Sequence, residues 1–106
     1  RKLENYVYLH LRRSFKEIQY FQNKDSECDF VVKWNEEIIG AVQVCWELNP
    51  DNLQREIKGL KAAIEETQAS KGVLLTWNQE DLLDGITVIP VWKWMMEPAR
   101  KFFGMN

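Results

Sequence analysis

The sequence predicts an α/β domain in which helices flank a central mixed sheet. Two apolar runs rich in β-branched residues, CDFVVKW from Cys28 and IIGAVQVCWEL from Ile38, are separated by a short polar break, which is typical of a β-hairpin. Apolar residues at helical spacing occur before and after this hairpin. The fully apolar run VLLTW from Val73 is typical of a strand buried in parallel pairing.

Composition indicates one folded domain over residues 1–106. The chain has 45% hydrophobic and 28% charged residues, as ordinary globular proteins do. We expect no membrane partner, because no apolar run approaches the roughly 20 residues that a membrane helix needs. The net charge of −2 argues against a strongly basic nucleic-acid binder. The chain opens on Arg1, so we expect a processed protein or a piece of a larger one.

The first element is predicted to be a helix from Leu3 to Arg13. Its apolar stripe consists of Leu3, Tyr6, Val7 and Leu11, broadened by Tyr8 and Leu9. Glu4 lies in the first turn, where the helix dipole stabilises a carboxylate. His10 has no second metal-type ligand at a helical offset, so we interpret it as a packing or surface residue. Basic residues cluster here, and this face either meets phosphate or is simply solvated: Arg1, Lys2, Arg12, Arg13 and Lys16.

Three meandering strands should follow. The first covers Glu17 to Gln22, residues 23–26 form a turn, and the hairpin supplies the other two strands. Side-chain alternation places Asp29, Val31 and Lys33 on one face of the second strand. On the third strand, Gln43 and Cys45 share a face.

A long helix is predicted from Pro50 to Ala69. Asn49 would cap it, Pro50 would occupy the first helical position, and Gly72 would end it. Its apolar stripe should cover one face of the sheet, and it consists of Leu53, Ile57, Leu60 and Ile64.

The last third of the chain should add two more strands. Residues 73–77 form the buried strand, and 78–85 form a polar loop. Residues 86–91 form a final strand in which Pro90 suits an edge or a strand end. Residues 92–96 are expected to form a helical turn, and the tail from Glu97 is not assigned.

Polar residues occur where the sheet should be buried. Asp29 and Gln43 lie among apolar neighbours, and burial of such groups costs a few kcal/mol each unless something binds them. Cys28 and Cys45 form neither a disulfide scaffold nor a zinc-ligand spacing. We expect them to be reduced, mostly buried, and on opposite faces of the sheet, in a cytoplasmic protein.

The order of elements, with Asp29 in ECDFVV and Gln43 in AVQVC, resembles the restriction-endonuclease-like fold of the PD-(D/E)XK superfamily. More narrowly, ENYVYLHLRR, ECDFVVKW, AVQVCWELN and REIKGL are similar to the uncharacterised C-terminal domain of prokaryotic AAA-type ATPases. The resemblance covers Leu3 to about Trp94 and implies an αβββαββ core. It also implies that residues 1–106 are the C-terminal part of a larger ATPase, with DNA and the ATPase portion as partners. We also expect a second copy of the chain as a partner.

The resemblance also implies a metal site and its chemistry. In that superfamily, an acid of the first helix, an aspartate of the second strand and an acid or glutamine of the third hold a divalent metal. Those roles fall on Glu4, Asp29 and Gln43, with Mg²⁺ or Mn²⁺ as the cofactor. The catalytic lysine of the family would stand at Cys45, and the residue before Asp29 is Cys28 where the family has proline.

Cys45 changes what this site is expected to do. A neutral thiol cannot match the charge that develops on a phosphoryl group, as an ammonium can. Another cation would have to replace it: Lys33 on the Asp29 face, or Arg55 and Lys58 on the long helix. We include Lys58 with Glu4, Asp29 and Gln43 among the catalytic candidates.

Three hypotheses stay open at this point. The chain is a metal-dependent DNA nuclease domain; or it is a non-catalytic domain for protein interaction, assembly or DNA recognition; or Asp29 and Gln43 merely satisfy internal polar groups. The second hypothesis would use an aromatic contact surface, although the same residues could instead fill the core: Trp34, Trp46, Trp92 and Trp94. No GxxxxGK[ST] nucleotide-binding loop is present, so ATP hydrolysis would belong to another segment.

Overall fold

The computed structural model describes residues 2–105. Its element order is α1 (Lys2–Arg12), β1 (Glu17–Gln22), β2 (Glu27–Trp34), β3 (Glu37–Val44), α2 (Leu53–Thr67), β4 (Lys71–Thr76), β5 (Asp81–Leu83), β6 (Ile86–Pro90), α3 (Val91–Trp94) and α4 (Ala99–Phe102). The six strands form one mixed sheet in the order β1-β2-β3-β4-β6-β5. The predicted mixed sheet flanked by helices is therefore confirmed. No helix within residues 2–105 has the length and apolarity required to cross a bilayer.

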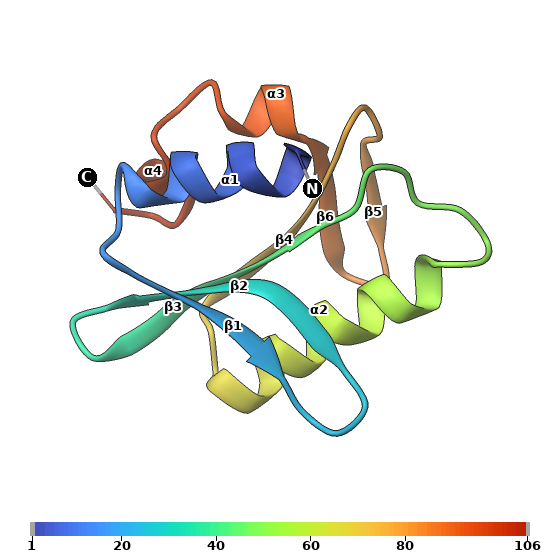
Figure 1. Cartoon of the computed structure of the whole chain (residues 1–106), viewed down its shortest axis with the longest axis horizontal. Coiled ribbons are helices and arrows are strands. Elements are labelled where there is room, and N and C mark those ends of the chain that lie inside the picture. Colours follow the sequence, from blue (N-terminus) through green and yellow to red (C-terminus); the bar gives the residue numbers. More distant parts are fainter. Residues whose placement is uncertain (1, 106) are drawn as a thin grey trace.

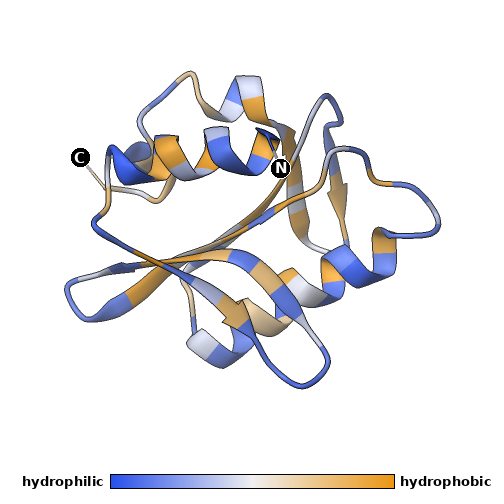
Figure 2. Cartoon of the chain, in the orientation of Figure 1, coloured by the Kyte–Doolittle hydropathy of each residue, from blue (hydrophilic) through white to orange (hydrophobic). Residues whose placement is uncertain are grey.

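Helices cover both faces of this sheet. α1, α3 and α4 lie on one face, and α2 lies on the other (Figure 1). Hydrophobic residues concentrate in the central strands, whereas the loops are mostly polar (Figure 2). The core accordingly has two parts: one under α1 contains Val7, Leu11 and Val42, and one under α2 contains Leu60 and Leu74.

The β2–β3 hairpin confirms the sequence prediction. The strands pair antiparallel from Phe30↔Val42 to Trp34↔Glu37. Asn35 and Glu36 connect them with φ values of 51° and 68°, which is the left-handed conformation that two-residue hairpin loops require. β3 then pairs in parallel with β4, which in turn pairs in parallel with β6. The prediction of a buried parallel strand at β4 is confirmed.

One prediction about the hairpin is wrong, because β2 contains an irregularity. Gln19 of β1 pairs with Val31, and Phe21 pairs with Cys28. Three residue steps of β2 therefore lie opposite two of β1, which is a β-bulge. Cys28 consequently turns to the same α2 side as Val31. Cys45 also packs against that side, so the two thiols share a face. Both are free; Cys28 is buried, and Cys45 is half-buried.

The first helix is placed correctly, but its apolar stripe is narrower than predicted. Leu3, Val7, His10 and Leu11 are buried, so His10 is a packing residue. The predicted stripe members Tyr6, Tyr8 and Leu9 are exposed instead. Their spacing places them on the sides of the helix that do not pack against the sheet, and they are exposed to solvent.

The second helix is shorter than predicted at both ends. Asn49 accepts hydrogen bonds from the backbone N–H groups of Asp51 and Asn52, which makes a turn, and α2 begins only at Leu53. The helix ends at Thr67 because Gln68 adopts a left-handed conformation, with φ 59°. Gly72 does not end the helix; it lies in β4, where a Cβ atom would come within 2.4 Å of Ile64 Cδ1.

Two short elements were not predicted. The polar loop contains β5, which pairs with β6 through a turn at Asp84 and Gly85, both at positive φ. β5 is therefore the edge strand, and Pro90 lies at the end of β6. The tail forms α4, which contributes Ala99 to the core under α1.

Candidate functional site

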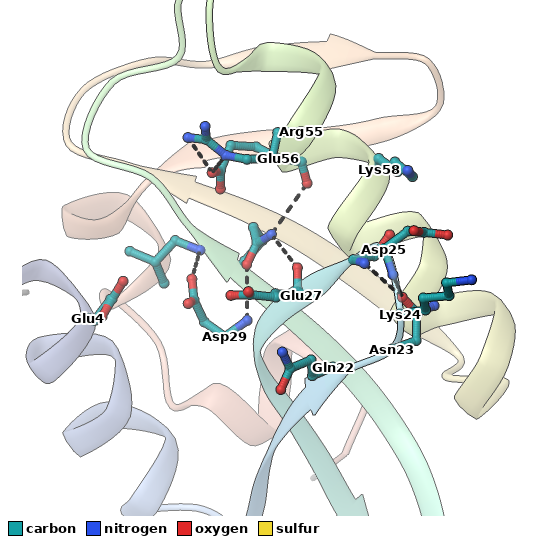
Figure 3. A pocket seen from close by; sticks show the side chains of 13 residues that line it. Glu4, Gln22, Asn23, Lys24, Asp25, Glu27, Asp29, Arg55, Glu56 and Lys58 are labelled. Atoms are coloured by element: carbon teal, nitrogen blue, oxygen red, sulfur yellow. Dashed lines mark hydrogen bonds and ion pairs between the residues drawn. The ribbon is translucent and has the colours of Figure 1, made fainter.

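A pocket of about 340 Å³ opens where β3 ends, between the first turn of α1, the β1–β2 turn and the start of α2. Glu4, Asp29, Gln43 and Lys58, the four residues selected from the sequence, all line it. Figure 3 shows Glu4 approaching from α1 on one side, while Lys58 comes from α2 on the other. The fold thus brings together residues from four different elements.

Asp29 and Gln43 are held by hydrogen bonds between side chains and backbone, which take the place of the backbone pairing between β2 and β3. The paired register of β2 with β3 begins at Phe30 and Val42. Beyond this pair, the backbone N–H of Asp29 donates to Gln43 Oε1 at 3.0 Å, and the N–H of Val44 donates to Asp29 Oδ2 at 2.8 Å. Each side chain therefore satisfies a backbone group on the neighbouring strand beyond the last paired residues.

Gln43 forms the floor of the pocket. Its Oε1 atom accepts from the Asp29 N–H, and its amide nitrogen donates to the backbone carbonyls of Glu27 at 3.1 Å and Glu56 at 3.4 Å. The amide thus connects β2, β3 and α2, and its engagement explains why a buried polar side chain is tolerated here. Gly59 makes the close approach of α2 possible, since a Cβ atom there would lie 2.0 Å from the Glu27 carbonyl oxygen and 2.8 Å from Gln43 Nε2.

The pocket is partly buried and lined by acids, and burial first, then the neighbouring charges, raise the pKa of two carboxyls. Burial, together with the charges of Glu4, Glu56 and Glu27, raises the pKa of Asp29 to about 6 against the opposing bond from Val44 N–H. Burial also raises the pKa of Glu56, although its neighbour Arg55 opposes the shift. These carboxylates repel one another, so a bound cation would relieve both effects.

The donor set fits a hard divalent cation by its chemistry. Mg²⁺ and Mn²⁺ prefer carboxylate oxygens, and Glu4, Glu27, Asp29 and Glu56 supply them from one pocket. Gln43 contributes less than expected, because Oε1 already accepts a hydrogen bond. Within residues 2–105, no three Asp, Glu, His or Cys side chains are gathered closely enough to hold a metal. Cation binding would therefore require the Glu4 or Glu56 side chain to turn toward Asp29.

Two acids of this pocket were missed from the sequence. Glu56 precedes the buried Ile57 on α2 and is itself largely shielded, with 15% of its side chain exposed. An acid at the flank of an apolar stripe was the available signal. Glu27 begins β2, and the signal available in the sequence was strand alternation, which places Glu27 on the same face as Asp29 two residues later.

Positive charge reaches the pocket from α2. Arg55 lines it, and its Nη2 atom lies 3.4 Å from Glu56 Oε2. Lys58 lines it one turn further along the helix. Lys33, the other proposed replacement for the family lysine, lies at the far end of β2, where it pairs with Glu36 at 3.7 Å.

Cys45, at the position of the family's catalytic lysine, is not among the residues that line the pocket. Its Sγ donates to the Glu47 carbonyl at 3.4 Å and accepts from Asn52 Nδ2 at 3.5 Å. Burial raises the pKa of this thiol, as does the charge of Glu56. Cys45 is therefore neutral at pH 7 and provides no charge to a reaction at Asp29.

Comparisons with known proteins identify an archaeal relative. The chain is 38% identical over 111 residues to the uncharacterized protein MJ1544 of Methanocaldococcus jannaschii. The match covers 91% of this chain and 24% of the relative, so the chain spans about a quarter of the length of the curated relative it matches. No family model matches the sequence. No solved structure matches the fold.

Proposed function

We propose that this chain is a nuclease-like domain with the αβββαββ core of the PD-(D/E)XK superfamily, and that it hydrolyses phosphodiester bonds in DNA with Mg²⁺ or Mn²⁺. The observation that carries the proposal is the convergence of Glu4, Asp29 and Glu56 on one pocket that Arg55 and Lys58 also line. The length of the archaeal relative supports the further proposal that the domain works beside another segment, which we take to be an ATPase.

The proposed roles follow from the positions of the side chains. Asp29, with Glu4 and Glu56, would hold the cation, which when bound polarises a phosphoryl oxygen and lowers the pKa of water. Gln43 orients Asp29 by accepting its backbone N–H. Lys58 and Arg55 would face the phosphate and offset the charge that develops on it, the role that Cys45 cannot fill.

Plasmid nicking tests this proposal. Supercoiled plasmid is incubated with Mg²⁺ or Mn²⁺ and with wild type, Asp29→Ala or Lys58→Gln, and relaxation is followed on a gel. We expect wild type to nick and both variants to lose most of that activity. Asp51→Ala is the matched control, because Asp51 is exposed and lies in the turn before α2. Equal nicking by wild type and Asp29→Ala would reject the proposal.

A second candidate function is protein interaction or assembly, and the exposed tryptophans favour it. Trp46 and Trp77 stack with ring centroids 4.7 Å apart and planes 6° apart, and both are more than half exposed. Trp92 and Trp34 are also exposed, whereas Trp94 is buried in the core. Clustered exposed indoles are typical of contact surfaces. We propose the remainder of the parent protein as the partner, with a second copy as the alternative.

Binding and light scattering separate this candidate from the nuclease. Trp46→Ser with Trp77→Ser should weaken binding to the rest of the parent protein, or reduce the measured mass if the domain self-associates. Trp34→Ser serves as a comparison, because Trp34 lies at the turn of the β2–β3 hairpin, whereas Trp46 follows the other end of β3. A monomer that shows no affinity for the remainder of its own protein would reject the assembly function.

A further inference from the structure

A second pocket lies at the opposite end of α1 from the acidic site. It has a volume of about 380 Å³ and is enclosed by the end of α1 and the connection from α3 to α4. These elements lie beside one another in Figure 1, although they are the two ends of the chain. The lining residues are His10, Arg13, Ser14, Met95, Met96, Glu97, Pro98 and Arg100.

Two hydrogen bonds between distant segments hold the walls of this pocket together. The buried His10 donates from Nε2 to the Glu97 carbonyl at 2.8 Å, because a carbonyl oxygen can only accept. The backbone N–H of Arg100 donates to Ser14 Oγ at 3.3 Å, so the hydroxyl proton of Ser14 stays available to a ligand. The second ring nitrogen of His10, Nδ1, is buried and has no partner within the described residues.

The pocket contains two arginines. Arg13 and Arg100 line it, and Arg12, Lys16 and Lys101 are their neighbours along the chain. Within residues 2–105, none of these five residues forms an ion pair, whereas Arg55, Lys61 and Lys93 all pair with acids. Glu97 is the acid among the lining residues. A chain of net charge −2 thus has two arginines without an acid partner among the described residues in one pocket, which is the electrostatic pattern of an anion-binding site.

We propose that this basic pocket binds a phosphate of a nucleic-acid backbone, with Arg13, Arg100 and the Ser14 hydroxyl as donors. The choice of nucleic acid rests on the proposed nuclease function. The spacing is suitable: α1 rises roughly 12 Å from Glu4 to its last residue, Arg12, at 1.5 Å per residue, and Arg13 follows in the next turn. That distance corresponds to about four base-pair steps of a duplex, so one DNA could reach both pockets along α1.

DNA binding in the absence of divalent cations tests the proposal. Fluorescence anisotropy of a short labelled duplex is measured in EDTA for wild type and for the double variant Arg13→Gln with Arg100→Gln. We expect binding to weaken about tenfold and the slope of log affinity against log salt to become shallower by about 1.8, because two phosphate contacts are lost. Lys61→Gln with Lys93→Gln is the matched control, since it also lowers the net charge from −2 to −4. The control should bind nearly as wild type does.

Each other outcome would overturn the proposal. Equal weakening by both double variants would mean that overall charge alone governs binding. A wild type that does not bind the duplex, but is protected from unfolding by inorganic phosphate, would have a small-anion site instead. Circular dichroism verifies that the variants fold, which is expected because both arginines are exposed. The assay measures binding and not cleavage, so failure of the nuclease proposal and failure of this one are distinguishable.

Discussion

The two ends of α1 carry opposite charge, and the chain builds them differently. At the first turn, Glu4 lines a pocket with Asp29 and Glu56, whose pKa values are raised because they are partly buried near other acids. At the last turn, Arg13 and Arg100 are exposed and surround a pocket whose walls are fixed by His10 and Ser14. The partly buried acids therefore lower the free energy of unfolding, whereas the exposed arginines at the basic end change it little. This difference is typical of a strained binding site beside a solvated one.

The largest effect is expected from adding charge to the floor of the acidic pocket. Gln43→Glu should lower the free energy of unfolding by about 2–3 kcal/mol at pH 7, because a carboxylate oxygen would face the carbonyls of Glu27 and Glu56. The loss should shrink at pH 5, where a protonated Glu can donate. Urea unfolding measures both values. Gln54→Glu, on the exposed first turn of α2, is the control and should change stability little. A metal-free Gln43→Glu protein as stable as wild type would contradict this account of Gln43.

A smaller gain is expected from removing charge from the wall of that pocket. The folded pKa of Asp29, about 6, lies above its ordinary value of 3.8. The folded protein therefore binds this proton more tightly than the unfolded chain, and wild type loses stability as pH rises from about 4 to about 6. Asp29→Asn should match wild type near pH 4 and exceed it by about 1 kcal/mol at pH 7, allowing for solvent screening. A difference that does not change with pH would contradict the assignment.

The smallest effect is expected at the basic end. Arg13→Gln with Arg100→Gln should change the free energy of unfolding by less than about 0.5 kcal/mol, because both side chains are exposed and make no ion pair with the described residues. Urea unfolding at pH 7 checks this value. A loss above about 1 kcal/mol would show that the arginines hold α1 and α4 together, and the contrast between the two ends would fail.

The sequence predicted the elements that depend on local pattern. The hairpin, α1 and the buried strand β4 all follow from residue spacing and turn residues, and the structure has them. The start of α2 was wrong because Asn49 was free to bond either a helix or a turn, and the choice depends on its surroundings. β5 and α4 are short and have no strong period, so packing determines them.

The candidate site was predictable only in part, for the same reason. Asp29 and Gln43 stood out because polar groups within apolar strands need partners. Those partners proved to be backbone groups of the neighbouring strand and of α2. Glu27 could have been selected, because strand alternation places it on the face of Asp29. Glu56 could not be selected, since it looks like an ordinary exposed acid until the close approach of α2 at Gly59 is known.

A manganese titration followed by calorimetry tests the central claim most directly, because it examines the acidic pocket without assuming a substrate. We expect wild type to bind one Mn²⁺ and Asp29→Asn to bind at least about tenfold more weakly, since a carboxylate ligand is lost. Asp51→Asn, which removes an exposed acid of the turn before α2, should bind as wild type does. Absence of binding by wild type, or equal affinity in wild type and Asp29→Asn, would contradict the claim that this pocket holds a divalent cation.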